Sequence, residues 1–193
     1  MNKSIYNPAK ISLKTLELNL ASLFSAIEIC LTNKFILPAL VLIYSSIDIV
    51  ASLERLPSEG TQSSFVRWVD KYLFKAKSLP CTAMELYAAR CAIIHTMAAE
   101  SKLSQQGKAR PVYYAWGTAE EKDLQLMGNK VGRTNYVSMH VSDLSEAFRL
   151  GWESYLKDLD CTPERKKTVY ANAGLWFTNL SMKEVESFLK IQK

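Results

Sequence analysis

A run of nearly unbroken apolar residues, ALVLIYSSIDIVASLE, constrains the fold of this chain more than any other stretch. Apolar side chains would lie on almost every side of a helix here, so we expect a helix at the centre of a helical bundle. Pro38 suits the first turn of that helix, where a backbone N–H is dispensable. The most apolar part, residues 35–47, is about 13 residues long and ends at Asp48, whereas about 20 are needed to cross a bilayer. The sequence therefore predicts a buried core helix and no membrane span.

Three more helices are predicted around this one, which together make an up-and-down four-helix bundle over residues 10–101. Large apolar side chains recur with a helical period over residues 13–31, which predicts a long amphipathic helix. The stretch SFVRWVDKYLF predicts a shorter third helix. Thr82 and Glu85 have the spacing of a capping box and open a fourth helix, expected to continue to about Ser101.

The second half of the chain predicts a small β insertion followed by more helices. Within residues 110–141, the stretches PVYYAW and NYVSMHV read as two strands that could pair as a ribbon. Between them we expect one helical turn and a loop. Residues 142–193 are expected to form closing helices, so the fold class is mainly α (α+β) in a single domain, residues 1–193. The start signals of these closing helices are Ser142 as an N-cap, Thr162–Pro163, and a capping box at Ser181–Glu184.

Composition narrows the classes of function only a little. The net charge of +5 permits nucleic-acid binding without arguing for it. The four cysteines form no C-x-x-C pair, which favours free thiols in a reducing cytoplasm. Cys91 and His95 stand one helical turn apart, but two ligands do not make a metal site. No secretory signal is visible near the N-terminus. We therefore expect a cytoplasmic protein with no metal and no cofactor.

Three polar residues interrupt the apolar helices. Burying the carboxylate of Asp48 without a partner is costly, so it should find a donor, for which Arg90 and His95 are the natural candidates. Arg90 and His95 lie five residues apart, so their directions on an ideal helix differ by about 140°. One helix alone would therefore make a poor two-residue site. Two copies of the helix that face each other across a two-fold axis could bring both residue types into one cleft.

The helix that begins at the capping box resembles the defining helix of the HEPN superfamily. HEPN proteins are small helical bundles that carry Arg, four to six residues, then His, and Arg90 and His95 match the four-residue spacing. The resemblance covers roughly residues 10–101. The stretches IYSSIDIVASLE and LYAARCAIIH also resemble those of bacterial proteins with a HEPN-like bundle.

The resemblance implies metal-independent RNA cleavage in the cleft of a homodimer. In that scheme His95 would move the proton of the attacking 2′-hydroxyl or the leaving 5′-oxygen, a role that suits a side chain titrating near neutrality. Arg90 would hold the scissile phosphate through its planar guanidinium. Many members of the superfamily are toxins or phage-defence effectors, sometimes partnered by a nucleotidyltransferase antitoxin.

Two alternatives stay open. Lys108, Arg110, Lys130 and Arg133 lie near aromatic residues of the β insertion and could hold single-stranded RNA by phosphate contacts and stacking; otherwise the aromatic side chains form the buried face of the strands. The chain could equally be a non-enzymatic interaction or scaffold protein. In that case the Arg-x4-His pair and Asp48 form a buried structural network.

Overall fold

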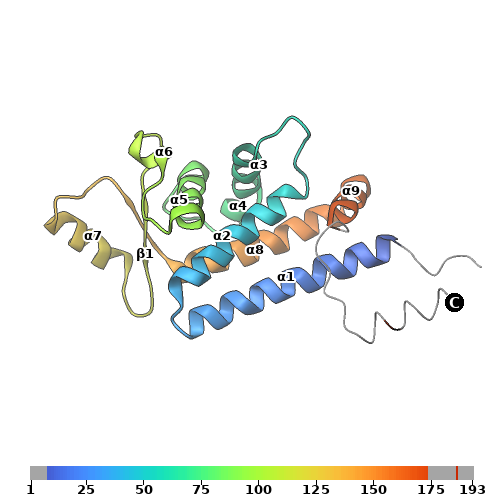
Figure 1. The fold of residues 1–193 in the computed structure, drawn as a ribbon, viewed down its shortest axis with the longest axis horizontal. Helices are drawn as coiled ribbons and strands as arrows, with labels where there is room; N and C mark the ends of the chain where they lie inside the picture. The colour runs from blue at the N-terminus through green and yellow to red at the C-terminus, as the bar shows by residue number, and fades with distance from the viewer. Residues whose placement is uncertain (1–7, 174–185, 187–193) are drawn as a thin grey trace, which may run out of the picture.

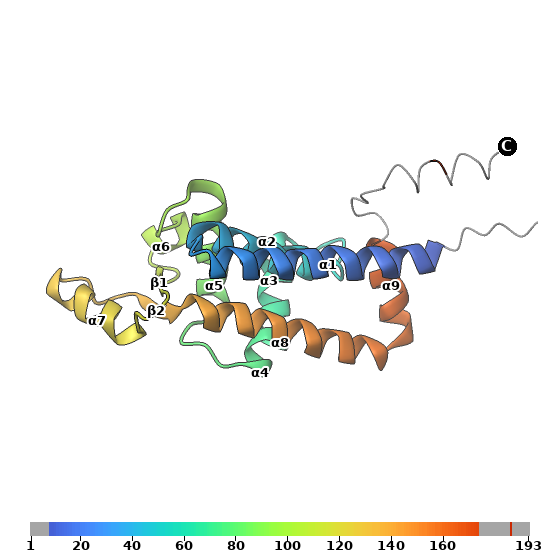
Figure 2. The ribbon, with the colours of Figure 1, turned by 90° about the horizontal axis from the view of Figure 1, so that it is seen from below.

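The computed structural model describes residues 8–173 and residue 186, and the side chains among them from Thr15 onward. Three long helices form the body: α1 (Pro8–Thr32), α2 (Ile36–Ser52) and α8 (Val141–Asp160). They run side by side along the long axis, as Figures 1 and 2 show, and α2 contacts both of the others. The prediction of a central α2 is confirmed, because most of its residues on every side are buried or half-buried.

The core draws on the second half of the chain more than the sequence indicated. One cluster of buried apolar side chains joins α1 and α2 with α8, although α8 was expected only as a closing helix. The α8 side chains that enter this cluster include Leu144, Phe148, Tyr155 and Leu159. The described chain is thus mainly helical, but its core is not confined to residues 10–101.

The third predicted helix is present and contains a wider turn. It consists of α3 (Thr61–Trp68), a π-helical turn (Val69–Leu73) and a last α-helical turn, α4 (Phe74–Ala76). The π turn packs on α8 where α8 carries Gly151. A Cβ atom at that glycine would lie 2.9 Å from the Cα atom of Leu73, so only glycine permits this approach of the two backbones.

The capping box at the start of α5 (Ala83–Thr96) is confirmed. The Thr82 hydroxyl accepts a hydrogen bond from the backbone N–H of Glu85, and the Glu85 carboxylate accepts one from the backbone N–H of Thr82. The predicted end near Ser101 is wrong, because Met97 takes the left-handed conformation (φ 50°) and closes the helix.

A separate short helix follows. It is α6 (Lys102–Gln105), and the hydroxyl of Ser101 accepts a hydrogen bond from the backbone of Ser104 at its start.

The two predicted strands exist and pair with each other, but the single helical turn expected between them is wrong. β1 (Val112–Ala115) and β2 (Val137–His140) pair in parallel, with Val112 opposite Val137. Parallel strands need a crossover, and the ten-residue helix α7 (Glu121–Lys130) supplies it. The resulting β1–α7–β2 lobe lies at one end of the molecule (Figure 1).

Helix α8 begins directly after β2, and the prediction of Ser142 as its N-cap is wrong. His140 occupies the cap, and its Nδ1 atom accepts a hydrogen bond from the backbone N–H of Ser142. Helix α9 (Pro163–Ala173) starts at the predicted proline and lies at the opposite end from the lobe. The capping box predicted at Ser181–Glu184 lies outside the described residues.

One segment of α1, Thr15–Thr32, is long and apolar enough to cross a membrane by length and composition alone. It is a different segment from the apolar run in α2, which is too short for the same test. Leu16, Leu20 and Ile27 on this segment are buried in the core cluster, so one face of the helix packs against the other helices of the bundle.

Candidate functional site

Helices α2 and α5 bring Asp48 and Arg90 into direct contact. Nη2 of Arg90 donates a hydrogen bond to Oδ2 of Asp48 over 2.6 Å, and the two side chains are only 13% and 19% exposed. Burial would lower the pKa of Arg90, but the charge and hydrogen bond of Asp48 outweigh it and raise that pKa. The guanidinium therefore stays charged and is held in one orientation.

Arg90 also contacts His95 within the same chain. Nη1 of Arg90 lies 3.1 Å from Nε2 of His95, whose side chain is exposed. The expectation that one helix keeps these two side chains apart is wrong, because the long arginine side chain spans the angle between them. A guanidinium can only donate, so Nε2 of His95 is the acceptor in this contact.

A cleft of about 640 Å³ opens beside His95. Tyr87, Cys91 and His95 line it from α5, and Lys102 and Gln105 line it from α6. The Tyr87 ring packs edge-on against Phe65, with centroids 5.5 Å apart, and it lies 6.0 Å from the guanidinium carbon of Arg90. The wall of the cleft thus offers an imidazole, a thiol and a phenol, and a guanidinium stands directly behind the imidazole.

The cysteines show no sign of a metal centre. Among the described residues, no three His, Cys, Asp or Glu side chains lie close enough to hold a metal ion. Cys91 is half-buried on the cleft wall, and burial raises the pKa of the Cys81 thiol to about 12. Cys81 is therefore an inert thiol at neutral pH.

The four basic residues expected to bind nucleic acid do not form one surface. Lys108 is exposed in the loop after α6. Arg110 makes two hydrogen bonds to the buried carboxylate of Glu85, the nearer over 2.5 Å, so this arginine anchors the start of α5. Only Lys130 and Arg133 lie together, at a second pocket.

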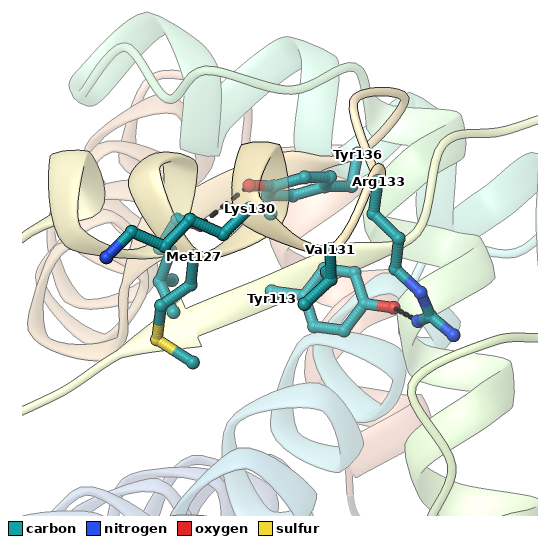
Figure 3. Close-up of a pocket in the computed structure, with 8 residues that line it drawn as sticks. Tyr113, Met127, Lys130, Val131, Arg133 and Tyr136 are labelled. Carbon is teal, nitrogen blue, oxygen red and sulfur yellow. Dashed lines mark hydrogen bonds between the residues drawn. The ribbon is translucent and has the colours of Figure 1, made fainter.

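The second pocket lies between β1, α7 and the segment that joins α7 to β2, and it has a volume of about 280 Å³ (Figure 3). Its walls are almost entirely apolar and come from Tyr113, Leu124, Met127, Val131 and Tyr136. Sequence reasoning missed this pocket, because only one helical turn was expected where α7 lies. Glu120 and Asp123 have capping-box geometry in the structure and were the signal for that helix.

Comparisons with models of protein families, with curated proteins and with solved structures found no match.

Proposed function

We propose that the protein binds and cleaves RNA without a metal ion, through Arg90 and His95, in the manner that the HEPN-like motif implies. The observation that carries the proposal is the contact between a buried, carboxylate-held guanidinium and an exposed imidazole at the edge of a cleft. Asp48 positions Arg90, and Arg90 in turn holds the imidazole of His95 at the edge of the cleft, where it can move a proton.

The chemistry follows from these two groups. A phosphate that enters the cleft accepts the hydrogen bond from Nη1 of Arg90 in place of His95, which releases the imidazole from that contact. His95 then removes the proton of the 2′-hydroxyl, the 2′-oxygen attacks phosphorus, and the bond from phosphorus to the 5′-oxygen breaks to leave a cyclic phosphate. The leaving 5′-oxygen needs a proton from a second acid. Each chain offers one histidine in this position, so the proposal includes a homodimer in which a second copy supplies that acid.

The HEPN-like motif also implies a biological role. A cytoplasmic RNA-cleaving protein of this kind would act as a toxin or defence effector, and a nucleotidyltransferase-type antitoxin is the partner that the resemblance implies.

The direct test is cleavage of single-stranded RNA by purified protein in EDTA. We expect wild type to cleave, His95→Ala to lose cleavage while retaining RNA binding, and Thr168→Ala to behave as wild type. Thr168 is the control because it is uncharged, exposed on α9 and not part of this cleft. Equal cleavage by wild type and His95→Ala would refute the catalytic proposal.

A second candidate is a non-enzymatic interaction or scaffold protein, which the low exposure of Asp48 and Arg90 favours. In this case their pair fixes the register of α2 on α5 and performs no chemistry. The two candidates differ in what a variant loses: a scaffold loses folding stability, whereas a ribonuclease whose His95 is replaced loses cleavage with its melting temperature unchanged.

A further inference from the structure

The pocket in the β1–α7–β2 lobe combines apolar walls with a cationic rim. Tyr113 and Tyr136 meet edge to face, with ring centroids 5.2 Å apart and an interplanar angle of 88°. Met127 and Val131 complete the walls, although these residues are 65% and 71% exposed. Large apolar side chains left open to solvent around a concave surface are typical of a binding site.

The walls are held in place by local contacts. The Tyr136 hydroxyl donates to the backbone carbonyl of Leu124 over 2.7 Å, so the ring lies across α7. Gly128 makes this possible, because a Cβ atom there would lie 1.9 Å from the Tyr136 hydroxyl oxygen. On the other side, Nη1 of Arg133 donates to the Tyr113 hydroxyl over 2.7 Å. The cavity is therefore preformed.

The charge of the rim selects the ligand. Lys130 and Arg133 extend to opposite sides of the pocket (Figure 3), and both are exposed. The nearest carboxylate to Arg133 is that of Glu100, 3.8 Å away, and no ion pair of Lys130 occurs among the described residues. The apolar walls offer almost no hydrogen-bonding groups that could recognise the edge of a nucleobase.

We infer that this pocket binds a small amphipathic anion, with an apolar ring or short chain in the cavity and a single carboxylate or sulfonate at one of the two rim cations, Lys130 or Arg133. The volume of about 280 Å³ suits one ring system or a short acyl chain. The inference is independent of the proposed RNA cleavage, because no residue is shared between this pocket and the cleft beside His95.

The experiment uses anilinonaphthalene sulfonate and its neutral analogue phenylnaphthylamine with the full-length chain. Methyl NMR of isotope-labelled methionines locates the site: the anionic probe should shift the Met127 signal, assigned with Met127→Leu, and leave Met97 unchanged. Met97 is the control because it lines a different apolar groove beside Trp116. Unlabelled phenylacetate should displace the probe, and uridine monophosphate should not.

Variants test the charge and the cavity separately. Replacing both rim cations, Lys130→Gln with Arg133→Gln, should weaken binding of the anionic probe about fivefold, as expected for the loss of one exposed ion pair. The same change should leave the affinity for the neutral analogue unaltered. Val131→Asp adds a negative charge at an exposed wall position and should also reduce binding of the anionic probe. Displacement by uridine monophosphate alone, equal affinity for both probes, or no shift at Met127 would each overturn the inference.

Discussion

Replacement of Asp48 by alanine is expected to lower the free energy of unfolding by about 2–3 kcal/mol. Breaking a fully buried ion pair costs about 3–5 kcal/mol, because one charge stays buried without a partner. An exposed pair is worth about 0.2–1 kcal/mol. Asp48 and Arg90 lie nearer the buried limit, since they are 19% and 13% exposed. The cost falls below that limit because Oδ1 of Asp48 and Nε of Arg90 already lack a partner within the described structure.

The assay is urea denaturation at neutral pH, with a double-mutant cycle. Arg90→Met keeps the apolar stem of the side chain and removes the charge. Its combination with Asp48→Ala should cost less than the sum of the two single changes, by about 1–2 kcal/mol of coupling. Arg149 and Glu153 form an i,i+4 pair that is about half exposed, so Arg149→Ala is the matched control and should cost at most about 0.5 kcal/mol.

Additive effects in the cycle, or a loss at Asp48→Ala no larger than that at the Arg149 control, would refute the reasoning. Either result would mean that water enters the contact and that Arg90 is free to serve a ligand. A large coupling together with loss of RNA cleavage in Asp48→Ala would show instead that the pair positions Arg90 for chemistry.

Two further predictions concern stability. The pKa of Glu85 is lowered in the folded chain: burial acts to raise it, but the hydrogen bonds from Arg110 and the Thr82 backbone prevail. A pKa that is lower in the folded than in the unfolded chain stabilises the fold above the unfolded pKa of about 4.3, and this stability is lost as the pH falls. Glu85→Gln should therefore show a smaller decline of the free energy of unfolding between about pH 5 and pH 3 than wild type. Equal declines in the two proteins would show that Glu85 is not the cause. Gly151→Ala should lower the free energy of unfolding by about 1–2 kcal/mol in urea, because the new methyl group meets the Leu73 backbone at 2.9 Å. A stabilised Gly151→Ala variant would place the π turn farther from α8.

The sequence predicted the elements well where local rules decide them. The capping box at Thr82 and the apolar run of α2 depend on neighbouring residues alone, and both are present as predicted. The direction of pairing of β1 and β2 depends on α7, whose own signal begins at Glu120, an uncommon N-cap residue. Parallel strands need a long crossover connection, so without a predicted helix between the strands there was no reason to expect parallel pairing.

One contact of the candidate site, between Asp48 and Arg90, was predictable from the sequence. That Asp48 needed a buried donor follows from the cost of an unpaired carboxylate, and Arg90 is that donor. Its contact with His95 was not predictable, because the angle between Cβ directions says little about where a long flexible side chain ends. The pairing of Arg110 with Glu85 was also hidden, since it joins a loop to a helix 25 residues earlier.

The contacts of the β1–α7–β2 lobe with the bundle determine how this end of the molecule unfolds locally. Helix α7 packs mainly on its own two strands, whereas α8 and α2 bury their side chains in the shared core. Local unfolding free energies follow the density of such contacts. The strands contribute Val112, Val137 and Met139 to the same core, so α7 is the part of the lobe with the fewest such contacts. We therefore expect the amide protons of α7 to exchange with solvent through partial openings that leave the bundle folded. A ligand in the lobe pocket would slow this exchange, because it stabilises the state in which α7 is packed on the strands.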